Sequence, residues 1–159
     1  MPIALNDLTV TIAHLDRATL LDEWRWLIGT NRAPVLVTAL GNAFVQDSAS
    51  GAITLLDAGT GQLNEIADSG EAFQALLSDT DFVSEHLLLD DWVALREAGK
   101  MLEPGQLFGY ITPPVLGGGF GPDNMEPTDI EVHFSISGQI HRQVKDLPDG
   151  APISSIKLA

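Results

Sequence analysis

Residues 104–143 read PGQLFGYITPPVLGGGFGPDNMEPTDIEVHFSISGQIHRQ, and this stretch decides the fold. It predicts a short strand at Leu107–Ile111, the stiff pair Pro113–Pro114, and a loop that contains Gly117, Gly118 and Gly119. Prolines fix φ and donate no hydrogen bond, whereas consecutive glycines permit positive φ or a close approach of the backbone. We therefore expect an architectural loop whose three glycines hold backbone angles that other residues avoid.

The glycine loop matches neither of the familiar phosphate-binding patterns. The sequence has no GxxxxGK[ST] and no GxGxxG after a strand. Free N–H groups in such a loop can cradle an anion. The architectural interpretation is nevertheless favoured, and no cofactor is expected.

The segment that follows the loop fits two structures. Apolar and polar residues alternate over 130–137, which is typical of a half-buried strand. Against this, Thr128 and Glu131 form the Thr-x-x-Glu pattern of a helix capping box. Gly138 would cost about 1 kcal/mol inside a helix, which weakens the helix prediction without excluding it. We expect a helix over 128–144.

Several motifs of this stretch resemble one bacterial family. They are Phe108-Gly109-Tyr110, Pro113 to Gly118, Asn124, and Val132-His133 through Gly138-Gln139. With Trp24–Leu27 and Val35–Asp47 added, the resemblance covers about residues 8–149. The family is the C-terminal domain of type VI secretion system immunity proteins, long catalogued as a domain of unknown function. There it often follows an N-terminal domain that resembles an insert of aspartyl-tRNA synthetases, which this sequence lacks. The resemblance implies a toxin-neutralising role.

Composition and charge restrict the partners. The 159 residues carry a formal charge of −14 and no cysteine, which excludes disulfide and thiolate chemistry. Nucleic acid and anionic membranes would be repelled, whereas a basic protein would be attracted. The negative charge by itself does not require such a partner, because solubility is a simpler explanation for it. No secretory signal and no apolar run of about 18 residues is present, so a cytoplasmic protein is expected.

The N-terminal part predicts a strand over 8–12 and a helix over 16–28, capped by Asp16 and ended by Gly29. Helical spacing places five apolar residues on one buried stripe: Leu20, Leu21, Trp24, Leu27 and Ile28. Trp26 projects to the opposite side. Coverage by another element is favoured over an exposed binding anchor, but Trp26 remains the best aromatic candidate for a partner contact.

The middle of the chain predicts a meander followed by helices. Short strands separated by turns are expected at 35–39, 43–47, 52–57 and 62–67. Helices are expected within 69–99, and a last strand at 153–158. The predicted fold is a single α+β domain over 1–159, with 150–159 as a tail. Its twisted antiparallel sheet, at 35–67, packs against the helices at 16–28, 69–99 and 128–144.

Acidic residues concentrate in the helical stretch. Residues 57–103 carry eleven acidic residues and only two basic ones, Arg96 and Lys100. Some of the acids are helix caps, so part of this concentration has a local cause. The remainder make this the face expected to meet a cationic partner. The candidate contacts are Asp79, Asp81, Glu85, Asp90 and Asp91.

The sequence offers little chemistry. Its four histidines, His14, His86, His133 and His141, are dispersed without a metal-binding spacing. On a helix, His133 and His141 would share one side but lie about 12 Å apart. We expect no metal and no catalysis. Three hypotheses follow: a protein that binds and blocks a basic toxin, such as a nuclease; a regulatory or scaffolding module; and, least supported, an enzyme that uses the glycine loop with His133.

Overall fold

The chain folds around a five-stranded antiparallel sheet, which confirms the predicted α+β class. The computed structural model describes residues 3–148, 153 and 155–158. The sheet order is β1-β2-β3-β4-β5, so sequence neighbours are also spatial neighbours. The strands are β1 (Thr9–Val10), β2 (Arg32–Thr38), β3 (Ala43–Asp47), β4 (Ile53–Asp57) and β5 (Gln62–Ala67). Glycines with positive φ at 41, 51 and 61 make the three tight turns of this meander.

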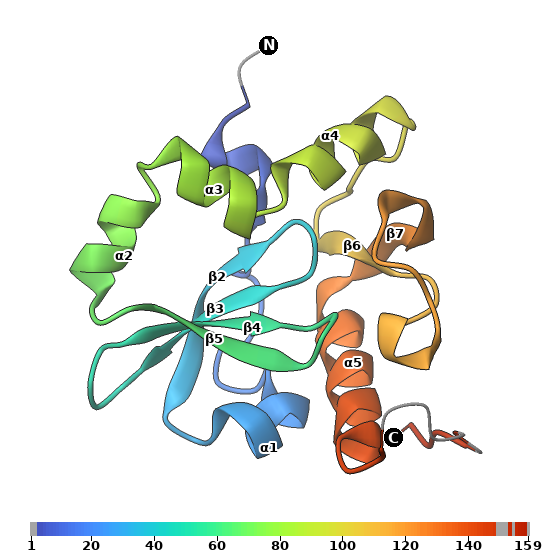
Figure 1. Ribbon diagram of the computed structural model, residues 1–159. Helices are drawn as coiled ribbons and strands as arrows, with labels where there is room; N and C mark the ends of the chain where they lie inside the picture. The colour runs from blue at the N-terminus through green and yellow to red at the C-terminus, as the bar shows by residue number, and fades with distance from the viewer. Residues whose placement is uncertain (1–2, 149–152, 154, 159) are drawn as a thin grey trace.

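Helices cover one face of the sheet and close its core. They are α2 (Gly70–Leu76), α3 (Thr80–His86) and α4 (Leu89–Glu97), which follow one another around the left and upper side of the sheet in Figure 1. Phe44 and Leu55 point to this face and pack with Phe73, Trp92 and Phe108. This layer lies within the predicted helical region 69–99.

The opposite face has a second core. Val45 and Leu56, the sequence neighbours of Phe44 and Leu55, point there because side chains alternate along a strand. They pack against Trp24 of the short helix η2 (Asp22–Trp24), Ile28 of α1 (Arg25–Ile28) and Phe134 of α5 (Ile130–Val144). Both faces are therefore buried at residues 43–45 of β3 and 53–56 of β4, where Thr54 is the one polar residue.

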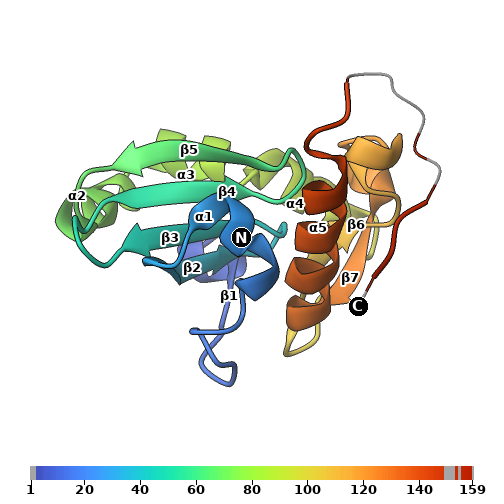
Figure 2. The ribbon, with the colours of Figure 1, turned by 90° about the horizontal axis from the view of Figure 1, so that it is seen from below.

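A second, two-stranded sheet leads into α5 and contacts it. It consists of β6 (Gln106–Tyr110) and β7 (Met125–Asp129), and its long connection contains the short turns η3 (Pro114–Leu116) and η4 (Pro122–Asn124). Phe108 N donates to Ala39 O at 2.7 Å, which ties this unit to the end of β2. In Figures 1 and 2, α5 stands at the end of the main sheet, beside β6 and β7.

Two local predictions are wrong. The helix expected over 16–28 begins only at Asp22, because the Asp16 carboxylate accepts from Ala18 N and forms an isolated turn. The stripe is still buried at Leu20, Leu21, Trp24 and Ile28 and half-buried at Leu27. The helix expected from Thr128 begins after Asp129, whose side chain accepts from Val132 N at 3.0 Å.

Residues 125–129 form the strand β7 in place of the first helical turn. Met125 to Asp129 pair with Tyr110 to Gln106, and Pro127 is tolerated because β7 is an edge strand. The last strand predicted at 153–158 is not seen at residues 153 and 155–158, which the structure describes.

Candidate functional site

One side of α5 binds the turns of the main sheet through two histidines. His133 Nε2 lies 2.8 Å from Gly41 O, in the β2–β3 turn. His141 Nε2 lies 3.0 Å from Ala58 O, in the β4–β5 turn. Since a carbonyl only accepts, each Nε2 carries the proton and donates it. The eight-residue spacing does put both rings on one side of the helix, where they hold the sheet rather than a ligand.

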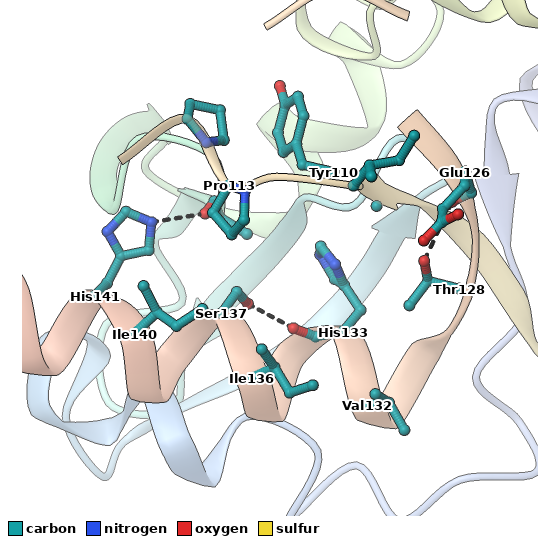
Figure 3. Close-up of a pocket in the computed structure, with 14 residues that line it drawn as sticks. Tyr110, Pro113, Glu126, Thr128, Val132, His133, Ile136, Ser137, Ile140 and His141 are labelled. Carbon is teal, nitrogen blue, oxygen red and sulfur yellow. Dashed lines mark hydrogen bonds between the residues drawn. The ribbon is translucent and has the colours of Figure 1, made fainter. Parts of the chain in front are cut away.

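A pocket of about 270 Å³ lies beside these histidines, between α5 and the β6–β7 unit. The α5 side is formed by Val132, His133, Ile136, Ser137, Ile140 and His141. The opposite side is formed by β6, β7 and the loop from Ile111 to Pro114, and Figure 3 shows Glu126 and Thr128 at one end. The pocket is thus apolar along its walls and polar at the end near Glu126.

The ionisable groups of this pocket are mostly neutral near pH 7. Burial lowers the pKa of His133 to about 4, although its bond to Gly41 O opposes the shift. Burial also lowers the pKa of His141. Burial is the largest cause that raises the pKa of Tyr110 to about 12, and the nearby carboxylates of Asp57 and Asp91 raise it further.

The arrangement does not resemble a nucleophile with its base. Ser137 Oγ donates to the backbone oxygen of His133 at 2.7 Å, and not to the imidazole. The low pKa of His133 makes its free nitrogen a weak base near neutrality. Within the described part of the chain, no group of three or more His, Asp or Glu residues is placed to hold a metal.

The five predicted acidic contacts lie on α3 and α4. Asp79 is the N-cap of α3 and accepts from Asp81 N and Phe82 N. Asp79, Asp81, Glu85 and Asp90 are exposed, and Asp91 is half-buried. Burial raises the pKa of Asp91, and the neighbouring Asp90 raises it further. None of the five forms a salt bridge to another described residue.

The two cations of this acidic stretch contact a ring and backbone oxygens, and not carboxylates. Arg96 lies over the ring of Trp92, 5.1 Å from its centroid. Lys100 Nζ donates to Met125 O at 2.7 Å and to Pro122 O at 3.3 Å. Neither cation forms a salt bridge with the carboxylates on α3 and α4, which outnumber the basic residues of these helices.

Trp26 lies away from these acids, on the opposite core. Its ring stacks on Trp24, with centroids 5.7 Å apart, and Nε1 donates to Gly138 O at 3.2 Å. Trp26 is half-buried. The element that covers it is α5, so only part of the indole is open to a partner.

The glycine loop is held by Asn124. Its side chain accepts from Thr112 N and donates to Thr112 O and Gly119 O, at 2.7 to 3.0 Å. Gly117 has the expected positive φ, 103°, and a Cβ on Gly118 would collide with Thr112 O. Gly119 has neither constraint, so the expectation of special angles at all three glycines is wrong.

The pocket beside His133 and His141 could not be predicted from the sequence. The only available signal was the eight-residue spacing of His133 and His141, which indicates one helix side but not what faces it. Tyr110 belongs to the motif Phe108-Gly109-Tyr110, but nothing in the sequence indicated that it lines a pocket. Its environment depends on Asp57 and Asp91, which are distant in sequence.

No helix in the described residues is long and apolar enough to cross a membrane. The chain resembles a solved structure, the crystal structure of Atu4351 from Agrobacterium tumefaciens, with a TM-score of 0.50 and 18% identity. The likeness covers 77% of this chain, which spans only 61% of that one, and it concerns the fold alone. No curated protein matches the sequence.

Residues 67–141 match the family described as T6SS immunity protein Tdi1, C-terminal. The match includes the acidic helices, the β6–β7 unit and most of α5. It also includes the motifs between Phe108 and Gln139, whereas Trp24–Leu27 and Val35–Asp47 lie outside it. The predicted resemblance is confirmed over this segment: residues 67–141 match the C-terminal domain family of type VI secretion system immunity proteins.

Proposed function

We propose that this protein binds a basic toxin, such as a nuclease, and blocks it without chemistry of its own. The observation that carries the proposal is the unbalanced acidic surface of α3 and α4 within the segment that matches the immunity family. The proposed contacts are Asp79, Asp81, Glu85, Asp90 and Asp91, with the open part of Trp26 as an additional one.

The charge of the toxin explains why the acids lie there. An enzyme that acts on nucleic acid needs a cationic cleft, because phosphate contacts supply most of its affinity. A protein that presents carboxylates to such a cleft associates quickly, and salt slows that association. Nucleic acid and anionic membranes are not expected as partners. Because the nucleic acid that such a toxin attacks is in the cytoplasm, we place the complex there.

The test is binding of the purified chain to the protein encoded by a neighbouring toxin gene, at low and high salt. All five acids are changed to Asn or Gln, and Asn at position 79 keeps the helix cap. We expect weaker binding and a smaller salt dependence. Each exposed charge contributes little alone, so the five are changed together.

A matched control neutralises five exposed acids outside residues 57–103: Asp7, Asp22, Asp123, Glu131 and Asp146. This variant carries the same net charge as the first. If both variants lose the same affinity, net charge and not the surface of α3 and α4 attracts the toxin. Tight binding that ignores salt and the first variant would contradict the proposed contacts, and an endogenous partner in place of a toxin would favour a regulatory module.

A further inference from the structure

We propose that the pocket between α5 and the β6–β7 unit accepts one basic side chain, a lysine or arginine, of the protein partner. The inference relies on the proposed function for the identity of the partner. The chemistry of the occupant comes from the pocket itself, from its size, its walls and its charge.

The size fits a single side chain. Pockets for drug-sized ligands span about 300–1,000 Å³, whereas this one measures about 270 Å³. Its walls are open to solvent: Ile111 is 53% exposed, Val132 47% and Ile136 36%. Pro113 also lines the pocket, so its walls are largely apolar, and Figure 3 shows Pro113, Val132 and Ile136 among the residues that form them. The methylene stem of a lysine or arginine is the part of a basic residue that packs along such a surface.

The charge of the pocket favours a cationic end group. Among the lining residues that the structure describes, none is a lysine or arginine. With His133, His141 and Tyr110 neutral near pH 7, Glu126 is the one lining residue that carries a charge. In the described part of the chain, its exposed carboxylate forms no hydrogen bond and no ion pair. The pocket therefore combines apolar walls with one unpaired negative charge.

Tyr110 connects the pocket electrostatically with the acidic surface proposed for the toxin. Tyr110 lines the pocket, and its hydroxyl is under the electrostatic influence of Asp91, on α4, and of Asp57. In the proposed complex, one basic partner covers both the start of α4 and the mouth of the pocket. Its other cations would face the acids, while one side chain enters the pocket.

The first test uses the protein alone. Amide NMR shifts are followed during titration with N-acetyl-argininamide, N-acetyl-lysinamide and the uncharged N-acetyl-norleucinamide. We expect shifts near Gly109 and Ser137, with the cationic amides binding about fivefold more tightly than the neutral one. Glu126→Gln should remove that preference, and Glu131→Gln, an exposed acid on α5 outside the pocket, should keep it.

Equal binding of the neutral amide, no effect of Glu126→Gln, or no shifts at these residues would overturn the proposal. The second test measures toxin binding by Glu126→Lys and its control Glu131→Lys. We expect at least a tenfold greater loss for Glu126→Lys, with Glu126→Gln in reserve if that variant fails to fold. If the wild type binds toxin and the two variants are equal, the pocket proposal fails and the proposed function stands. If the wild type binds no toxin, the proposed function fails and the amide titration decides the pocket.

Discussion

His133 Nε2 donates to Gly41 O across 2.8 Å, and this bond joins α5 to a turn 92 residues earlier in the chain. The turn requires a glycine at position 41, just as the hydrogen bond requires the histidine. Gly41 has φ of 91°, and a Cβ built there would lie 2.9 Å from His133 Nε2 and 3.0 Å from Phe108 O. Glycine at this position lets the helix, the main sheet and β6 meet.

We predict that Gly41→Ala destabilises the protein more than Gly51→Ala. Both glycines have positive φ, so both substitutions cost roughly 1–2 kcal/mol of backbone strain. Only Gly41 also has close neighbours, since a Cβ at Gly51 meets nothing within 4 Å. Urea unfolding of the two variants measures the difference. Equal losses would mean that the His133 ring moves aside without cost.

The lowered pKa of His133 also predicts how stability depends on pH. The folded state keeps His133 neutral down to a pKa of about 4, whereas the unfolded chain takes up a proton near 6.5. Between these values the unfolded state binds more protons, so stability falls as pH decreases from 6.5 towards 4. The lowered pKa of His141 adds to the same trend.

His133→Gln removes one of these titrations and keeps an N–H donor on the side chain. We expect its free energy of unfolding to decrease less than that of the wild type between pH 7 and pH 5, in denaturant titrations at both values. Carboxylates titrate in both proteins, so only the difference between them is informative. If the free energy of unfolding fell by the same amount between pH 7 and pH 5 in both proteins, the folded state would not keep His133 neutral.

Trp24 is predicted to be the largest single contributor to the second core. It is fully buried, and its ring lies 5.7 Å from that of Trp26 and 5.3 Å from that of His141. Removing a buried aromatic side chain costs about 3–5 kcal/mol. Trp24→Ala should therefore lower the free energy of unfolding by this amount, and a melting temperature equal to that of the wild type would contradict the packing.

Much of this core could be predicted from the sequence, because its signal is local. Alternation and turn glycines located β3 at 43–47 and β5 at 62–67, and helical spacing marked Trp24 as buried. The pattern did not reveal that the helix begins only at Asp22, since Asp16 caps a single turn as well as it caps a helix.

Contacts between distant segments could not be predicted in the same way. The sequence of β7 contains Pro127 and fits the start of a helix, but pairing with β6 makes this segment a strand. The candidate pocket depends on the same contacts, because its walls come from Ile111, Glu126 and Ile136 on three different segments. The acidic surface could be predicted more easily, because the acids of 79–91 are close in sequence and lie on consecutive helices.

The glycine loop gives a matched pair of substitutions. A Cβ at Gly118 would collide with Thr112 O and lie 2.7 Å from Asn124 Nδ2, whereas one at Gly119 meets nothing within 4 Å. We predict that Gly118→Ala breaks the Asn124 clamp and lowers stability, while Gly119→Ala changes it by less than about 0.5 kcal/mol. Thermal unfolding of both variants tests this, and a neutral Gly118→Ala would show that the loop adapts.

Gly138 lies in the interior of α5, where glycine is about 1 kcal/mol worse than alanine for an isolated helix. Helix propensity alone thus predicts that Gly138→Ala stabilises the protein. The structure predicts the opposite, because a Cβ would lie 2.6 Å from Glu23 O, and backbone atoms cannot swing aside as a flexible side chain can. The same close approach lets Trp26 Nε1 reach Gly138 O. We expect Gly138→Ala to raise the helix content of a peptide spanning 128–145, measured by circular dichroism, and to lower the stability of the whole protein. A stabilised protein would mean that α5 can move away from η2 at little cost, and that the contact with Glu23 does not fix its position.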